Sequence, residues 1–209
     1  MNDRSLKKVK KMFERINNKS LTDSGKLLTK RLIYASLPVI LISCTLVMFL
    51  LELSNFPGTL DDTMLGFNAE IIKAHFAMMK SADMTFFILG NLLDYMFMIG
   101  YGCFFYSSAR YLSWNYQQGS LPLKVGKIIA WIGVFSAICD AVENVFLFSM
   151  TFNPVGFPNW LAIAHSTFAL LKFILMYLTM GWLILSFVLN KIPSISKRIN
   201  CKVTTDLVK

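Results

Sequence analysis

Four long apolar runs limit the folds open to this chain. They cover residues 32–53, 84–106, 125–150 and 160–189. A helix of roughly 20 apolar residues crosses about 30 Å of hydrocarbon, and a backbone in lipid must satisfy its own hydrogen bonds. Of the 209 residues, 55% are hydrophobic and only 16% are charged, unlike a soluble domain. The sequence therefore predicts an all-α integral membrane protein, folded as a four-transmembrane-helix bundle.

The charges between these runs predict their orientation. Residues 1–31 hold ten Lys or Arg against three acids, and the connection after the second run and the C-terminal segment are also basic. The connection 54–83 is mainly acidic, and the turn 151–159 carries no charge. Because basic segments stay in the cytoplasm, both termini are predicted to be cytoplasmic, with the protein in the cell membrane. This distribution explains the net charge of +9 without nucleic acid as a partner.

We expect three regions: a basic cytoplasmic tail (1–31), a transmembrane domain (32–190) and a second basic tail (191–209). No apolar run precedes residue 32, so the first span is expected to serve as the membrane anchor. In the first tail, Leu6, Val9, Phe13 and Ile16 recur at helical spacing among lysines. Two alternatives fit this pattern: an amphipathic helix on anionic lipid headgroups of the bilayer, or a solvated tail.

The first outside connection contains a second amphipathic pattern. Residues 67–80 predict a short helix across the outer mouth of the bundle. The face expected to be apolar is formed by Phe67, Ile71, Ala74 and Met78, with Ile72, Phe76 and Met79 beside them. His75 in this helix is predicted to be an exposed or interfacial residue rather than a ligand.

The third span contains the motif with the highest free-energy cost of membrane insertion, an Asp-x-x-Glu-Asn sequence formed by Asp140, Glu143 and Asn144. An ionisable side chain near the bilayer centre costs on the order of 2.5–3.5 kcal/mol, so the motif needs partners. Helical spacing and depth bring polar residues of the second and fourth spans to the same level, in the outer half of the bilayer. The candidate ligand-binding pocket comprises eight residues: Asn91, Asp94, Tyr101, Asp140, Glu143, Asn144, His165 and Lys172. The first span offers only Ser36 and Ser43 as weak lining.

Two roles are open for this pocket. In the structural role, Lys172 pairs with Asp140 or Glu143, and Asp94 is satisfied by Asn91, Tyr101 or Asn144, which fixes the helix register. The functional role is favoured by the number of groups, because one Lys–Asp pair would suffice for register. Asp140 and Asn144 share a stripe of small residues, whereas Glu143 lies about a quarter turn away.

Cofactor chemistry has little support in the sequence. Asp, Glu and His side chains could ligate a divalent cation, but Lys172 in the same layer would repel it, so no metal or other cofactor is predicted. The motif of a serine nucleophile is absent. The cysteines show no metal-binding spacing. Cys201, among basic residues, is a candidate for palmitoylation.

The chain resembles a group of uncharacterised prokaryotic four-span membrane proteins. The resemblance rests on residues 93–101, with Asp94 followed by aromatic residues and Tyr101, on the D-x-x-E-N-V sequence 140–145, and on Lys172 in the fourth span. An amphipathic segment before the second span is also similar. The resemblance covers roughly residues 67–185 and implies four spans, but no activity.

Three hypotheses about function follow. The first is binding or passage of a small cationic or protonatable ligand, with the acids as counter-ions and His165 as a proton-linked group; it favours a homo-oligomer or a receptor-like pocket. The second is an intramembrane enzyme acting on a lipid or isoprenoid, with Asp140 or Glu143 as acid or base and Lys172 fixing its charge. The third is a structural or assembly factor with a purely architectural polar network.

Overall fold

The computed structural model describes the backbone of residues 3–191 and the side chains from Asp23 onward, except those of Leu60 and Asp61. Over this range the chain is helical, without strands. Its elements are α1 (Asp3–Leu53), α2 (Leu60–Leu65), α3 (Ala69–Met78), α4 (Ser81–Ser113), α5 (Leu121–Thr151) and α6 (Asn159–Lys191). Four helices are long and apolar enough to cross a membrane: α4, α5, α6 and the Asp23–Leu53 part of α1. The predicted four-helix membrane bundle is confirmed.

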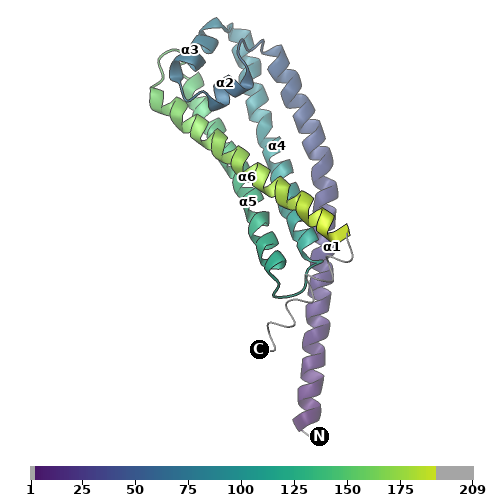
Figure 1. Ribbon diagram of the computed structural model, residues 1–209. Coiled ribbons are helices and arrows are strands. Elements are labelled where there is room, and N and C mark those ends of the chain that lie inside the picture. The colour runs from purple at the N-terminus through teal and green to yellow at the C-terminus, as the bar shows by residue number, and fades with distance from the viewer. Residues whose placement is uncertain (1–2, 192–209) are drawn as a thin grey trace.

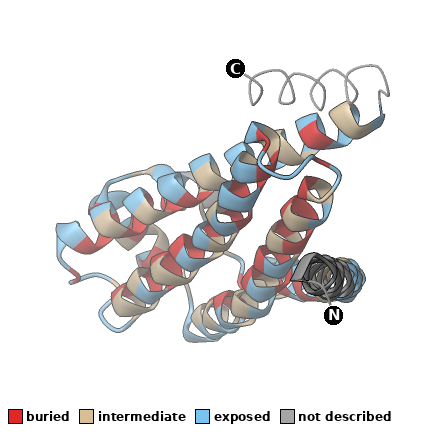
Figure 2. Cartoon of the chain, turned by 90° about the horizontal axis from the view of Figure 1, so that it is seen from below, coloured by how far each residue is buried: buried red, intermediate tan, exposed pale blue. Residues whose placement is uncertain are grey.

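Helix α4 holds the bundle together. It packs along α1 on one side and along α5 on the other, while α6 packs mainly on α5 and touches α4 less. Figure 1 shows α6 crossing the bundle obliquely, with α2 and α3 gathered at one end. In Figure 2, α1 is seen nearly end-on at one edge. We call the end that carries α2 and α3 the capped end, and the opposite end, where Arg110, Lys124, Lys127 and Lys191 lie, the basic end.

Small residues allow these helices to approach closely. A Cβ atom added at Gly102 would lie 3.0 Å from the Cβ of Ala137, and one at Gly133 would lie 2.6 Å from the Cβ of Phe105. The small-residue stripe predicted in the third span therefore faces α4. On the other side of α4, Gly100 gives room to Val39 and Ile40 of α1.

Helix α1 is longer than the predicted first span, because it runs unbroken from Asp3 to Leu53 and continues through Pro38. Its N-terminal part projects beyond the bundle in line with the span (Figure 1). The side chains of residues 3–22 lie outside the described ones, so their proposed contact with anionic lipid stays a prediction. The tail after Lys191, with Cys201, is also outside the described range.

The serines of α1 do not line the polar pocket as expected. Both are buried, in the helix that packs along α4. The hydroxyl of Ser36 donates to the carbonyl of Ile33 at 2.9 Å, and that of Ser43 to Val39 at 2.5 Å. Since each hydroxyl is satisfied within its own helix, the two serines serve close packing.

Helix α3 forms where predicted, but its buried side is formed by the flanking apolar residues rather than by the centre of the expected face. Ala69, Ile72 and Phe76 are buried, whereas Ile71 and Met78 of the expected face are exposed. The register is set by α6: the Phe67 N–H donates to the Ser166 hydroxyl at 3.1 Å, and the Ala69 N–H to the Asn159 side chain at 3.2 Å. The rest of the expected face, Phe67 and Ala74, is also exposed.

His75 on α3 is partly buried rather than fully exposed. Its ring meets Phe56 edge to face, with ring centroids 5.3 Å apart. The backbone of Gly58 lies so close to this ring that any side chain at position 58 would collide with it. His75 therefore packs the connection between α1 and α2 against α3.

Candidate functional site

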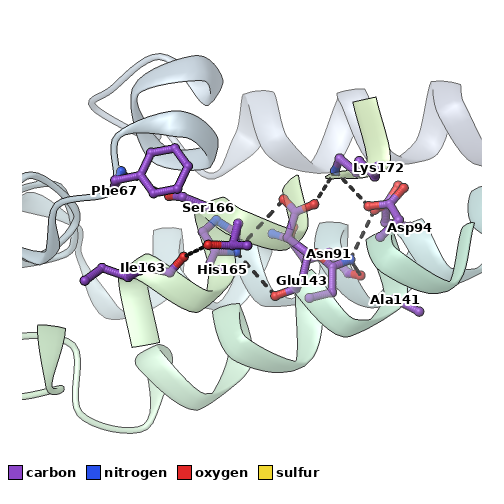
Figure 3. Close-up of polar contacts among 12 residues, drawn as sticks. Phe67, Asn91, Asp94, Ala141, Glu143, Ile163, His165, Ser166 and Lys172 are labelled. Atoms are coloured by element: carbon purple, nitrogen blue, oxygen red, sulfur yellow. Dashed lines mark hydrogen bonds and ion pairs between the residues drawn. The ribbon is translucent and has the colours of Figure 1, made fainter. Parts of the chain in front are cut away.

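Lys172 of α6 joins two carboxylates of α5. Its Nζ atom lies 2.8 Å from Asp140 Oδ1 and 2.6 Å from Glu143 Oε2. Asp140 and Glu143 are one helical turn apart, so a single ammonium group between them can contact both. All three residues are buried, and Figure 3 shows Lys172 directed toward Glu143. Both pairings that the sequence left open are therefore present.

A second group of contacts ties α4 to α5. The Tyr101 hydroxyl donates to Asp140 Oδ2 at 2.9 Å, so both oxygens of Asp140 have a partner. The Asn144 amide donates to Asp94 Oδ2 at 3.1 Å and approaches the Asn91 carbonyl at 3.3 Å. Of the three partners considered for Asp94, the structure selects Asn144. Asp94 is also the only carboxylate of the cluster that is not fully buried.

His165 of α6 lies beside Glu143 (Figure 3). Its Nδ1 atom lies 3.3 Å from the Glu143 carbonyl oxygen and 4.0 Å from Glu143 Oε1. With Nδ1–H donating to this carbonyl, a neutral imidazole keeps a free lone pair at Nε2. Each of the two side chains is only 1% exposed.

Glu143 and His165 hold unused hydrogen-bonding capacity. Glu143 Oε1 is buried and makes no hydrogen bond within the described part of the chain, and the same holds for His165 Nε2, although the Thr63 backbone also interacts with the His165 ring. Leaving a buried polar atom unpaired costs about 1–3 kcal/mol, more for a charged one. Such atoms in a native fold call for an explanation, and a bound water or ion is a common one.

A small cavity lies beside Glu143 and His165, and α2 forms part of its wall. Its volume is about 20 Å³, and its lining includes Asn91, Glu143, Asn144 and His165 together with Thr63 and Met64 of α2. A cavity of this size holds about one water molecule, and its polar lining can bind one. The polar cluster therefore ends, toward the capped end, in a space suited to one water.

The charges of the cluster do not balance. Three carboxylates face one ammonium group, so with a neutral His165 the formal sum is three negative charges against one positive, or −2. A buried net charge is expensive in a low-dielectric interior, and still more so within a bilayer. A bound positive charge in the cluster would reduce this cost.

All eight residues of the predicted pocket thus lie in one connected region. Three further polar groups support it. The Ser136 hydroxyl donates to the Lys172 carbonyl at 3.1 Å, the Tyr95 hydroxyl donates to the Ala141 carbonyl at 3.2 Å, and Thr63 lines the cavity. Ser136 lies four residues before Asp140, so its helical spacing could have placed it on the same face.

Metal binding has no geometric support in the part of the chain that the structure covers. No group of three or more His, Cys, Asp or Glu side chains in it is arranged to hold a metal ion. The position that a cation would take between Asp140 and Glu143 is filled by Lys172 Nζ.

Comparison of the chain with known protein families, with characterised proteins and with solved structures finds no match. The site is therefore interpreted from its own geometry.

Proposed function

We propose that this multi-pass membrane protein reversibly binds a proton at the Glu143–His165 pair, taken up from the capped side. The proposal depends on one observation: Glu143 Oε1 is buried, makes no hydrogen bond to the described residues and lies 4.0 Å from His165 Nδ1, and both residues line a cavity for one water. A water there would pass a proton either to Oε1, giving a neutral carboxylic acid, or to Nε2, giving an imidazolium. Either event reduces the negative charge of the cluster by one.

The size of the cavity favours a proton over a larger ligand. About 20 Å³ leaves no room for an organic cation, and the neighbouring Lys172 ammonium opposes a metal cation. Asp140 is a poorer acceptor, because Lys172 and Tyr101 already donate to its two oxygens. Asp140, Tyr101 and Asn144 therefore build the frame, and Glu143 with His165 forms the proton-binding part.

The orientation belongs to the same proposal. With the basic end in the cytoplasm, as the positive-inside rule predicts, the capped end faces outward and the site takes its proton from outside the cell membrane. Protein function would then respond to the external proton concentration.

Infrared spectroscopy of the purified protein in nanodiscs tests proton binding. A buried protonated carboxylic acid gives a C=O stretching band, and we expect a pH-dependent band that disappears in Glu143→Gln. Glu52→Gln is the control, because Glu52 is exposed on α1, away from the cluster. The proposal fails if, at every pH at which the protein stays folded, neither a carboxylic acid band that depends on Glu143 nor an imidazolium band that depends on His165 appears.

The other two functions receive less support. An apolar groove between α4 and α5 is lined by Tyr95 and Ala141 but by none of the three carboxylates. A lipid in this groove would thus not meet the acids that an intramembrane enzyme would use. A purely architectural network would leave the buried Glu143 Oε1 atom, which makes no hydrogen bond to the described residues, unexplained.

A further inference from the structure

An apolar groove runs between α4 and α5 on the outer surface of the bundle, and none of the three carboxylates of the polar cluster lines it. It has a volume of about 480 Å³ and is lined mainly by apolar side chains. Those that matter here are Ile99, Cys103 and Tyr106 of α4 and Trp131, Val134 and Ile138 of α5. Leu32 of α1 contributes to one wall near the basic end.

The groove has the length of one lipid leaflet. Toward the middle of the bundle its lining reaches Tyr95, whose hydroxyl bonds to the Ala141 carbonyl of α5. Toward the basic end its lining reaches Tyr106 and Trp131, which meet edge to face with ring centroids 5.5 Å apart. Eleven helical residues from Tyr95 to Tyr106 rise about 16 Å, roughly half the thickness of the hydrocarbon layer. A single acyl chain of the leaflet at the basic end would match this length.

Two basic side chains lie just beyond the end of the groove that is nearest the basic end of the bundle. Arg110 follows Tyr106 by four residues on α4, and Lys127 precedes Trp131 by four residues on α5. Residues four apart lie on the same helix face, so both side chains continue the faces that line the groove. Among the described residues neither cation has a carboxylate within ion-pair distance. Arg110 rests on the Trp114 ring, 5.9 Å from its centroid.

We propose that this groove is a binding site for an anionic glycerophospholipid. One acyl chain lies between α4 and α5, and the headgroup phosphate lies between Arg110 and Lys127. A guanidinium group is suited to bidentate contact with phosphate, and an ammonium group adds a point charge. Basic pockets between transmembrane helices on the cytoplasmic side are suited to such headgroups. The proposal concerns a different surface from the proton site and does not depend on it.

The cations distinguish specific binding from ordinary solvation by lipid. An apolar groove alone would accept the chain of any phospholipid, because lipid tails fill all such surfaces equally well. With Arg110 and Lys127 at its end, the same groove should prefer a lipid of net negative charge. Basic residues near a membrane surface each contribute enough to anionic lipid binding that two together predict a preference of roughly five- to thirtyfold.

Native mass spectrometry of the detergent-purified full chain tests the site, with phosphatidylglycerol and phosphatidylcholine of identical acyl chains as probes. The unmodified protein should retain phosphatidylglycerol roughly five- to thirtyfold more strongly, and Arg110→Gln with Lys127→Gln should remove this preference. Val134→Phe, which fills the groove and keeps both cations, should weaken binding of both lipids. Circular dichroism shows whether each variant is folded, and Val134→Phe provides an independent second test.

The matched control removes two charges at the same end of the bundle but away from the groove. Lys26 and Lys30 lie on the side of α1 turned away from Leu32 by their helical spacing, so Lys26→Gln with Lys30→Gln should keep the preference. Equal retention of the two lipids by the unmodified protein would overturn the proposal. If the Lys26 and Lys30 control loses the preference for phosphatidylglycerol equally, the proposal is also overturned, because the basic end would then attract anionic lipid without a specific site. A dimer that forms without lipid and is abolished by Val134→Phe would assign the groove to a second copy of the chain instead.

Discussion

Lys172 Nζ on α6 lies 2.6 Å from Glu143 Oε2 on α5, in a part of the bundle where both side chains are buried. The same ammonium group contacts Asp140, which in turn accepts a hydrogen bond from Tyr101 of α4. One lysine therefore links three helices through two carboxylates. Glu143 differs from Asp140 because its Oε1 atom makes no hydrogen bond to any residue that the structure describes. The cluster thus combines a fixed part with a part that can still accept a proton.

Lys172→Leu should lower both the thermal stability and the abundance of the protein. The change leaves Asp140 and Glu143 as buried carboxylates without a counter-charge, and breaking a buried ion pair in this way costs about 3–5 kcal/mol. Thermal denaturation monitored by fluorescence-detected size-exclusion chromatography measures the effect. Glu143→Gln, which keeps the shape of the side chain and leaves Lys172 paired with Asp140, should retain near-normal abundance. The paired network is refuted if Lys172→Leu and Asp140→Leu both leave the melting temperature unchanged.

Tyr101→Phe should destabilise the bundle by about 1–2 kcal/mol, because it removes the hydroxyl that donates to Asp140 Oδ2. Tyr177→Phe on α6 is the matched control: it deletes the same atom from an exposed tyrosine. The difference in midpoint between these two variants in chemical denaturation measures the contribution of the hydrogen bond. If both variants unfold together with the unmodified protein, the Tyr101–Asp140 contact contributes nothing to stability.

The architecture and the polar cluster could be foreseen because each depends on a local pattern. Apolar runs of sufficient length define the spans, and the cost of buried charge requires Asp94, Asp140 and Lys172 to find one another. Helical spacing and depth then select the facing residues. Their use as a ligand site is a separate question, which proximity alone does not answer.

The details that sequence could not supply depend on how helices meet. The buried face of α3 is set by hydrogen bonds from Phe67 and Ala69 to α6, and such contacts between distant segments leave no periodic pattern. Several apolar residues of α3 fit either face, so spacing alone could not choose between them. The prediction that the serines of α1 line the pocket was wrong for a related reason. A serine hydroxyl in a helix can donate to a backbone carbonyl of the same helix as readily as it can line a pocket.

Gly133→Ala should destabilise the protein by about 1–3 kcal/mol, because the added methyl group would lie 2.6 Å from the Cβ of Phe105 and force α4 and α5 apart. Gly181→Ala provides the matched control, since nothing lies within 4 Å of a Cβ atom there. Without that conflict, replacing a helical glycine should be neutral or gain up to about 1 kcal/mol. The melting temperatures of the two variants, measured by circular dichroism, should therefore shift in opposite directions or by clearly unequal amounts. Equal shifts would mean that α4 and α5 do not pack closely at Gly133.

The proposed orientation predicts which positions are open to a reagent outside the cell. In a background without native cysteines, Glu70→Cys at the capped end should react with a membrane-impermeant maleimide added to intact cells. Lys124→Cys at the basic end should react only after the membrane is permeabilised. Both original side chains are exposed, so a difference in labelling reports the side of the membrane rather than burial. The opposite labelling pattern would reverse the orientation and place the proton site on the cytoplasmic side.

Ser166→Ala should loosen the cap that covers the Glu143–His165 cavity. The Ser166 hydroxyl accepts the hydrogen bond of the Phe67 N–H, at a residue whose φ of 49° is unfavourable for a bulky side chain. Without this bond, opening of the segment from α2 to α3 should become about two- to tenfold more frequent, which hydrogen–deuterium exchange of residues 60–78 measures. Thr167→Ala is the control, because the Thr167 hydroxyl bonds only within α6, to the Ile163 carbonyl. If the cap gates proton entry, Ser166→Ala should also speed the appearance of the Glu143-dependent infrared band after a pH jump. Faster hydrogen–deuterium exchange with an unchanged rate of band appearance would show that protons reach the cavity by another route.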